Sequence, residues 1–487
     1  MVTRHVETRP GLYRDSVALM QISSALTRLP AVSSALVAMA TELNLDLLSQ
    51  MGFEPPAGAG PNDMLVAIET ADPQVLPGVL DRLEAELSSS TVPSSQSTVE
   101  VAPRTTASAA RAFGASVVLV STPGRYAFVE AMDALDAGTS VMIFSDNVPL
   151  AQEIRLKRAA AERGLLVMGP DCGTAVVGGV GLGFANVVRP GPVGLVAASG
   201  TGAQQVMSLL STVPGAGVSH CLGVGGRDLS ADVGGVSTRA ALAALDADPD
   251  TELIVVLGKP PAPEVASSLS ALPSTKPVLF APLGIGRPDL TAVAESVLSH
   301  LGLPVPSWPT FVPSMRRSPS PGSVRGLFSG GTLCVEAMVL ASDMLGPIRS
   351  NVPIRPEWTH EGGEEGHTML DLGSDEYTVG RPHPMIDYGP RLSLLRAASA
   401  DPSCRVVLLD VVLGHGAHPD PCSELAPVIE EALDRTAPLD LVVSLVGTPD
   451  DPQDLSGQAS SLSSAGAWVF GSNAAATRHA VGLVGAA

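Results

Sequence analysis

The sequence is poor in aromatic residues and in basic charge. Only 3% of the 487 residues are Phe, Tyr or Trp, and 29 Lys and Arg stand against 49 Asp and Glu, a formal net charge of −20. Few aromatics argue against a surface that stacks bases of single strands or RNA. The acidic balance argues against a polybasic face for nucleic acid or membrane. We therefore expect neither as a partner, and any bound anion should be held locally.

Cysteine and long apolar runs are also scarce. The five cysteines lie far apart and form no Cys-x-x-Cys pair; they are Cys172, Cys221, Cys334, Cys404 and Cys422. This pattern makes neither a disulfide scaffold nor a structural zinc site, and it suits a reducing compartment. No run approaches the roughly 18 apolar residues of a membrane helix, and the N-terminal MVTRHVETRPGLYRDS is charged where an export signal is apolar. A cytoplasmic location is expected.

What the sequence does contain is 45% apolar residues, arranged as short apolar runs that alternate with longer amphipathic ones. At about 150 residues per domain, the length predicts roughly three domains. Apolar strands separated by helices are typical of parallel sheets covered on both faces. We predict an α/β fold of several domains, with doubly wound parallel sheets and a small N-terminal α/β domain.

The rhythm of strands and helices sets the expected boundaries. In the small N-terminal domain, VALMQISSAL and VSSALVAMATEL have helix-like spacing and MLVAIET is strand-like. A linker rich in Ser, Pro and Thr, STVPSSQSTVEVAPRTTAS, follows. The predicted segments are 1–104, 105–189, 190–302, a Pro/Ser-rich linker at 303–323, and 324–487.

Two glycine-rich turns occupy equivalent places in two of these domains, each between an apolar strand and a helix. The first comprises Ser199, Gly200, Thr201 and Gly202, and the second Ser329, Gly330, Gly331 and Thr332. Unpaired N–H groups at a helix N-terminus favour an anion. The simpler interpretation is ordinary capping. Because there are two such turns, we expect both helices to face one phosphate or carboxylate at the carboxyl ends of the strands.

Titratable residues are dense between Gly366 and Pro421. In GRPHPMID, His383 is a candidate for proton exchange and Arg381 for binding an acidic group, unless His383 only supports the loop. Asp410 ends the apolar strand RVVLLD and is a further catalytic candidate. His415 and His418 lie close to Asp410 and Asp420, but zinc sites usually have more compact ligand sets, so no metal site is predicted.

Several long segments resemble known families. GTSVMIFSDNVPLAQEIRLKRAAAERGLLVMGPDCGTAVV resembles the second half of the CoA-binding domain of the succinyl-CoA synthetase alpha subunit, and PGPVGLVAASGTGAQQV with HCLGVGGRDLS resembles its ligase domain. SGGTLCVEAM, GHTMLDLGSDEYTVGRPHPMID and LLDVVLGHGAHPDP resemble the FdrA family of acyl-CoA-synthetase-like proteins. The resemblance extends from about Arg111 to about Gly447.

The resemblance implies roles for the domains and for particular residues. It implies a partial, Rossmann-like CoA-binding domain at 105–189 and flavodoxin-like ligase domains at 190–302 and 324–487. CoA is then a candidate ligand, and Asp171 is a catalytic candidate that is expected to position a ligand. The thiol of Cys172 beside it is either a nucleophile or an inert small residue of the turn. The residues implied for CoA binding are Gly124, Arg125, Gly169, Pro170 and Cys172.

The sequence also departs from the synthetases. Their phosphorylated histidine has no counterpart in KPVLFAPLGIGRPDL, their acidic residue after the preceding strand is replaced by Lys259, and no ATP-grasp domain is visible. We therefore expect no phosphohistidine. The resemblance implies an acyl-CoA synthetase activity. The missing histidine and ATP-grasp domain instead favour direct transfer of an acyl or carbamoyl group to phosphate, with phosphate or an acyl phosphate as ligand. The family's association with purine-nitrogen breakdown through allantoin and oxamate suits carbamoyl transfer. Separate catalytic or kinase subunits and a homo- or hetero-oligomer are expected partners. The alternative is a non-catalytic subunit that binds a CoA ester or nucleotide.

Overall fold

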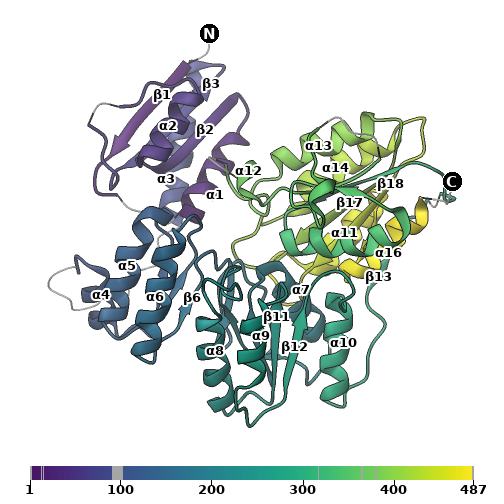
Figure 1. Ribbon diagram of the computed structural model, residues 1–487. Coiled ribbons are helices and arrows are strands. Elements are labelled where there is room, and N and C mark those ends of the chain that lie inside the picture. The colour runs from purple at the N-terminus through teal and green to yellow at the C-terminus, as the bar shows by residue number, and fades with distance from the viewer. Residues whose placement is uncertain are drawn as a thin grey trace. The chain divides into compact units, whose positions relative to one another are not determined.

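The computed structural model describes residues 3–12, 14, 16–56, 58–89, 103–315, 317–362, 366–378 and 381–484 (Figure 1). The chain divides into two compact units. The first comprises Met1–Pro103 together with Asp375–Asp387, and the second comprises Arg104–Ser374 and Tyr388–Ala487. The segment 375–387, expected within 324–487, thus groups with the N-terminal residues. Most of the predicted linker before Arg104 lies outside the described residues.

The first unit is a small antiparallel sheet with helices on both faces. Its strands are β1 (Thr3–Arg9), β3 (Met64–Thr70) and β2 (Val32–Met39), in that order across the sheet. Helices α1 (Ser16–Thr27) and α3 (Leu76–Ser89) pack on one face, and α2 (Glu42–Gln50) packs on the other. The helix predicted from VSSALVAMATEL is wrong, because β2 lies there. A strand covered on both faces has no polar face, so its sequence lacks the alternation that identifies a strand.

The second unit begins with a short parallel sheet. Its strands are β4 (Val117–Val120), β5 (Ser140–Ile143) and β6 (Val167–Met168). Helices α5 (Gly124–Asp136) and α6 (Leu150–Glu162) pack on its apolar core, and α4 (Thr106–Phe113) packs on α5. The predicted alternation of strand and helix is present here.

A six-stranded sheet follows. Its order is β12 (Val278–Pro282), β11 (Leu253–Gly258), β9 (Val193–Ala197), β10 (Val218–Gly223), β7 (Thr174–Val177) and β8 (Val180–Gly183). The first four strands are parallel. The hairpin β7–β8, expected in the domain 105–189, instead pairs antiparallel with β10. An unpaired edge of β10 would leave backbone groups without partners, and the hairpin supplies them. The helices of this sheet are α7 (Gly200–Ser211), α8 (Val236–Ala247), α9 (Pro263–Ser270) and α10 (Leu290–His300).

The third sheet of the second unit has seven strands. Their order is β13 (Thr310–Phe311), β19 (Trp468–Phe470), β18 (Asp440–Val446), β17 (Cys404–Val412), β14 (Ser323–Phe328), β16 (His367–Asp371) and β15 (Ile348–Arg349). All are parallel except β13, a strand inside the predicted linker 303–323. The helices are α11 (Gly331–Leu345), α13 (Gly389–Ala400), α14 (Pro421–Leu433), α15 (Leu455–Ser464) and α16 (Asn473–Leu483). The predicted α/β fold with largely parallel sheets is confirmed.

Helices from the two larger sheets pack against each other within the second unit (Figure 1). Helix α7 contacts α11 and α10, and α10 also contacts α16. The buried carboxyl group of Glu336 in α11 accepts hydrogen bonds from Leu290 N at 2.6 Å and from Asn473 Nδ2 at 2.7 Å. These bonds tie α11 to α10 and α16, and α7 packs on both α10 and α11. Within the described part of the chain, every helix is too short or too polar to cross a membrane.

Candidate functional site

The two glycine-rich turns meet inside the second unit. Ser199 Oγ lies 2.6 Å from Thr332 Oγ1, a hydrogen bond that joins one turn to the other. The approach is reciprocal: a Cβ atom at Gly330 would lie 2.8 Å from the Thr201 side chain, and one at Gly202 would lie 3.1 Å from Thr332 Cγ2. Only glycine allows each turn this close to the threonine of the other. The structure therefore brings all eight predicted anion-binding residues into one place.

The first turn is a capped helix N-terminus. Ser199 is extended, at φ −151° and ψ 115°, and its hydroxyl oxygen accepts a hydrogen bond from Gly202 N at 3.1 Å. This bond satisfies one of the orphan donors at the start of α7. Capping, the simpler interpretation of this turn, is thus one real role of Ser199. It leaves the N–H groups of Gly200 and Thr201 without an acceptor among the described residues.

The second turn differs because a carboxylate already fills part of it. Asp410 Oδ1 accepts hydrogen bonds from Ser329 N at 2.7 Å and Ser329 Oγ at 2.9 Å, and Asp410 Oδ2 accepts one from Gly330 N at 2.8 Å. Arg391 Nη2 lies 3.4 Å from Asp410 Oδ1, and both side chains are fully buried. The prediction that Ser329 and Gly330 hold an external anion is therefore wrong for their N–H groups. Asp410, a catalytic candidate from the sequence, is thus engaged in holding the shape of this turn.

The second turn keeps two donors of its own. The N–H groups of Gly331 and Thr332, at the start of α11, have no acceptor within the described residues. Both residues are partly exposed, as are Gly200 and Thr201. Each helix thus keeps two N–H groups close to the Ser199–Thr332 hydrogen bond. Such groups and the aligned helix dipoles favour negative charge.

Charged groups at the ends of neighbouring strands surround the turns. Lys259 directly follows β11, whose Leu257 O accepts a hydrogen bond from Ala198 N at the end of β9. Asp371 ends β16, beside Gly331, and both Lys259 and Asp171 act electrostatically on Asp371. In the sequence, Lys259 stands out only as a departure from the synthetases, and Asp371 only as one of the titratable residues between Gly366 and Pro421. The feature of the sequence that could have identified Asp371 as a site residue is its position at the end of a strand.

The residues implied for CoA binding divide into two groups. Gly124 and Arg125 begin α5, and Arg125 is exposed, with its guanidinium 4.9 Å from the centre of the Tyr126 ring. A Cβ atom at Gly124 would lie 2.1 Å from Asp146 O, so this glycine is required for the close approach of the loop after β5. The start of α5 therefore keeps an exposed cation.

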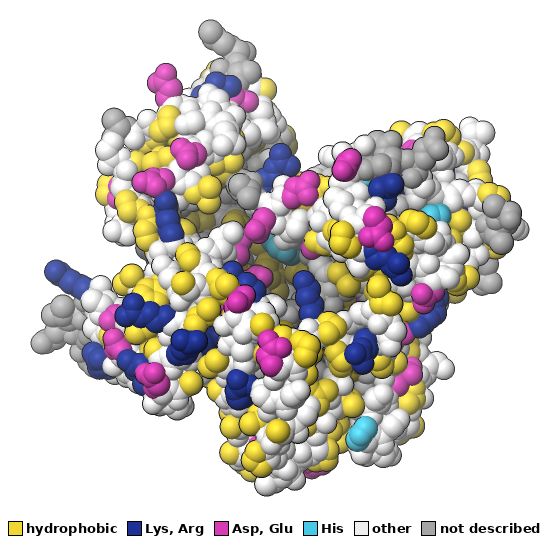
Figure 2. Space-filling model, in the orientation of Figure 1, with side chains coloured by type: hydrophobic (Ala, Val, Ile, Leu, Met, Phe, Trp, Pro, Cys, Tyr) yellow, Lys and Arg dark blue, Asp and Glu magenta, His cyan; other side chains and the backbone are white. Residues whose placement is uncertain are grey.

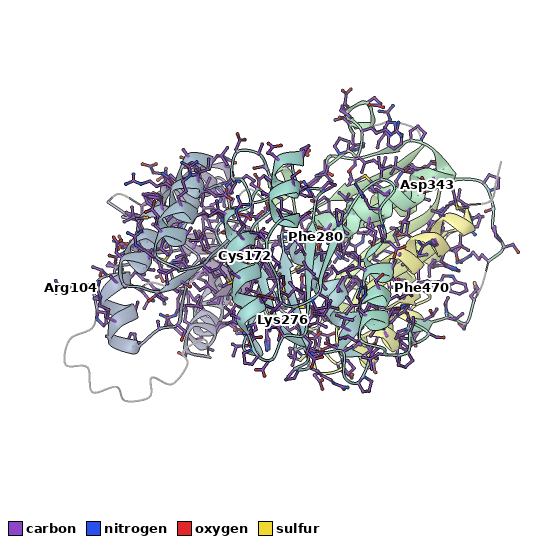
Figure 3. All side chains as sticks on the ribbon, turned by 60° about the horizontal axis from the view of Figure 1, so that its bottom comes forward. Arg104, Cys172, Lys276, Phe280, Asp343 and Phe470 are labelled. Carbon is purple, nitrogen blue, oxygen red and sulfur yellow. The ribbon has the colours of Figure 1, made fainter. Side chains whose placement is uncertain are left out.

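The other group, around GPDCGT, is mostly closed. Gly169, Pro170 and Cys172 are buried, whereas Asp171 is exposed. Cys172 Sγ lies 3.5 Å from Thr174 O, and a Cβ atom at Gly223 of the neighbouring strand would lie 2.4 Å from this sulfur. Figure 3 marks Cys172 within the body of the second unit. Buried against β10, these three residues offer no surface to CoA, which corrects the expectation for them.

The same burial makes Cys172 a poor nucleophile. Burial raises the pKa of its thiol to about 12, so almost no reactive thiolate exists at neutral pH. All five cysteines are free and buried. With Ellman's reagent at pH 8, we expect none of the five thiols to react within minutes in the native protein, and all five to react after denaturation. Rapid labelling of one thiol, assigned to Cys172 by peptide mapping, would contradict the buried arrangement.

His383 and Arg381 lie in the first unit, within the segment 375–387. Met385 N donates a hydrogen bond to His383 Nδ1 at 3.2 Å, and Asp387 N donates one to His383 O at 3.1 Å. These bonds hold the turn itself, which is the loop-supporting role weighed above. The structure assigns these two catalytic candidates to a different compact unit from Asp171 and Asp410.

The two histidines considered for a metal have other partners. His418 is buried, its Nε2 lies 3.2 Å from Glu424 Oε1, and its Nδ1 accepts a hydrogen bond from Asp420 N at 3.0 Å. His415 is exposed and exchanges backbone hydrogen bonds with Ala185. Among the residues that the structure describes, no three His, Cys, Asp or Glu side chains are grouped closely enough to hold a metal ion.

Two protein-family models match the chain. The first, described as AllF, heavy metal-associated domain, matches residues 1–103, and the second, described as CoA-ligase, matches residues 327–483. The residues matched by the first model, 1–103, do not fit a heavy-metal ion. Residues 1–103 contain no cysteine and only one histidine, His5, whose Nε2 lies 3.3 Å from Glu7 Oε2.

Curated relatives include whole-length and partial matches. YahF of Escherichia coli (strain K12), described as uncharacterized, is 36% identical over 491 residues, 94% of each chain. The ADP-forming sulfoacetate-CoA ligase subunit SauD of Bilophila wadsworthia is 30% identical over 34% of this chain, and the malate–CoA ligase subunit alpha of Methylorubrum extorquens is 27% identical over 37%. The matches span 58% and 62% of these two ligase subunits. The protein therefore belongs to the family of Escherichia coli YahF, in this chain an AllF-type N-terminal domain joined to a CoA-ligase domain of the succinyl-CoA-ligase-like superfamily.

Proposed function

We propose that the second unit transfers an acyl-type group to or from phosphate, and that the phosphoryl oxyanion binds at the N-termini of α7 and α11. The observation that carries this proposal is the Ser199–Thr332 hydrogen bond of 2.6 Å, which joins two helix N-termini that retain free N–H groups. Lys259 adds a positive charge beside them. Membership of a CoA-ligase-type family supports the reaction class.

The chemistry needs a site for negative charge. A phosphate oxygen attacks the carbonyl carbon of R–CO–X, the new C–O bond forms, and the C–X bond breaks to release X, which takes up a proton. X is the sulfur of CoA or an amide nitrogen. Negative charge develops on the carbonyl oxygen and persists on phosphate throughout. Preorganised N–H donors stabilise such charge without reorganisation, and losing one such donor costs roughly 10²- to 10³-fold in rate.

CoA is the acyl carrier that we propose for this reaction. Its phosphates require a local basic surface, which the net charge of −20 does not supply overall. Figure 2 shows Lys and Arg side chains gathered over the part of the second unit built from α5 and α6. Exposed cations there include Arg125, Arg155 and Arg158. We assign the CoA phosphates to this surface and keep Asp171 as a ligand-positioning residue.

The finer identity of the reaction is also part of the proposal. The FdrA-like segments favour a carbamoyl or related acyl group in purine-nitrogen breakdown through allantoin and oxamate. A kinase or a further catalytic subunit is the expected partner, because the chain has no histidine at the position that is phosphorylated in the synthetases. Five free thiols suit a cytoplasmic location.

The anion site is tested by removing one N–H group. Gly200 is the first residue of α7, a position that suits proline, and Ser199 before it is already extended as a proline requires. We expect Gly200→Pro to weaken phosphate binding roughly ten- to hundredfold, the loss of one charge-assisted hydrogen bond. Gly200→Ala is the matched control, since it adds a Cβ and keeps the N–H; that Cβ would lie 3.3 Å from Thr174 Oγ1. Isothermal titration measures both.

Equal phosphate affinities for the proline and alanine variants would contradict this site. Turnover is tested separately, by following phosphate-dependent release of thiol from acyl-CoA esters and of amine from carbamoyl amides. Catalysis that falls in Gly200→Pro supports group transfer at the turns. Tight CoA binding with no turnover across the panel would favour the alternative, a non-catalytic subunit that binds CoA esters.

A further inference from the structure

Asp371 lies beside the first turn of α11, and hydrogen bonds between its backbone and the Asn351 side chain hold it there. Asp371 N donates a hydrogen bond to Asn351 Oδ1 and Asp371 O accepts one from Asn351 Nδ2, both at 2.9 Å. Its Oδ1 accepts a hydrogen bond from Gly373 N at 2.9 Å. Its Oδ2 points at the helix N-terminus, because a Cβ atom at Gly331 would lie only 2.6 Å away. Among the described residues, Oδ2 has no hydrogen-bond partner.

This carboxyl group is almost completely removed from solvent, with only 8% of the residue exposed. A carboxyl group with so little contact with water is costly to ionise. The free N–H groups of Gly331 and Thr332 begin the same turn. Oδ2 therefore faces the place where the proposed oxyanion binds, and a ligand there is what would complete its hydrogen bonding.

Charged and titratable groups from four other elements act on or near Asp371. Asp410 from the end of β17, Asp171 from the loop after β6 and Lys259 after β11 influence its ionisation, and the thiol of Cys334 in α11 is influenced by it. Burial is the main cause that raises the pKa of Asp371 to about 7, with the two aspartates acting in the same direction. The Gly373 N–H and Lys259 act against that rise.

We propose that Asp371 carries a proton into the oxyanion site: in its neutral form its Oδ2–H donates a hydrogen bond to the bound oxyanion, while Lys259 supplies the opposing charge. An ionised Asp371 beside an anion would repel it in a site of low dielectric. Anion binding and protonation of Asp371 are therefore coupled, and each favours the other by the same factor. This inference rests on the proposed function, because it needs an oxyanion at the two turns.

The sign of the coupling follows from the direction of the pKa change. Binding raises the pKa of Asp371 above that of the free protein. Well below pH 7 Asp371 is already protonated, so binding takes up no proton. Above pH 7 binding takes up a proton, and affinity falls by about tenfold for each pH unit. Sulfate is the suitable probe, because it does not titrate in this range.

The experiment is isothermal titration of the full chain with sulfate at constant ionic strength, at pH 5.5 and pH 8, in buffers that differ in ionisation enthalpy. We expect uptake approaching one proton at pH 8 and none at pH 5.5. Asp371→Asn keeps a neutral donor and should bind sulfate with no proton uptake and no pH dependence. Asp343→Asn, on the exposed C-terminal part of the same helix α11 (Figure 3), should behave as the unchanged protein.

The outcomes separate this inference from the function on which it rests. Sulfate binding without proton uptake, or uptake that persists in Asp371→Asn, overturns the role of Asp371 and leaves the oxyanion site intact. No sulfate binding at either pH overturns the oxyanion site and the proposed function with it. Lys259→Met should weaken binding at least tenfold at both pH values while proton uptake at pH 8 remains, and unchanged affinity would remove Lys259 from the site.

Discussion

Replacement of Asp410 by alanine is expected to lower the free energy of unfolding of the second unit by about 3–5 kcal/mol, the cost typical of breaking a buried ion pair. The change leaves the Arg391 guanidinium buried without its carboxylate, and it removes the acceptor of Ser329 N and Gly330 N. The turn before α11 then loses what holds its shape. Urea denaturation should show a lower midpoint with an unchanged m value, and sulfate binding should be lost.

Two further variants make this prediction specific. Asp343→Ala removes an exposed carboxylate from α11 and should change stability by no more than about 0.5 kcal/mol. The double replacement Asp410→Leu with Arg391→Met removes both charges, so it should recover much of the stability that the single change loses. It should not recover sulfate binding, because the turn still lacks its acceptor. A single Asp410→Ala variant as stable as the Asp343 control would contradict the bracing role.

Replacement of Lys157 by methionine is expected to be destabilising by a similar amount, about 3–5 kcal/mol. Lys157 Nζ donates hydrogen bonds to Glu153 Oε1 at 2.8 Å, to Asp228 Oδ1 at 2.9 Å and to the backbone Val224 O at 2.9 Å. The side chains of Lys157, Glu153 and Asp228 are all buried. Methionine leaves two buried carboxylates without this cation. Glu153 keeps Arg227, whose Nε lies 2.8 Å from Glu153 Oε2, so Asp228 bears most of the loss.

This network joins α6 to the loop before α8, so its loss has a local signature. Hydrogen exchange should rise first in α6 and around Asp228, which also accepts hydrogen bonds from Ser237 N and Thr238 N. Arg158→Met is the matched control: Arg158 is exposed on the same helix, one residue further along. Equal stability of the two methionine variants would show that the network contributes little.

Local features of the site could be predicted from the sequence because they depend on residues next to one another. A strand that ends in Ser-Gly-Thr-Gly or Ser-Gly-Gly-Thr and continues as a helix is a local pattern, and both turns form where it predicts. Their meeting was expected from the repetition of the pattern. The N-cap of Ser199 follows from its own side chain and the N–H three residues on.

Other features could not be predicted, because they depend on strands far apart in the chain. Asp410 occupies the second turn since β17 is the neighbour of β14, a pairing of segments about eighty residues apart. The hairpin β7–β8 joined another sheet for the same kind of reason, an open edge on β10. The apolar spacing of VSSALVAMATEL predicted a helix where β2 lies, because β2 is covered on both faces and so lacks a polar face.

The sequence by itself determined the α/β alternation and the two glycine-rich turns. Only the tertiary structure decided that the carboxyl group of Asp410 accepts hydrogen bonds from one turn and that the carboxyl group of Asp371 lies beside Gly331. The reason is physical: strand identity and helix caps arise from neighbouring residues, whereas the raised pKa of Asp371 and the burial of Asp410 depend on how much solvent is excluded and which charges are adjacent. Those quantities exist only once the sheets have assembled.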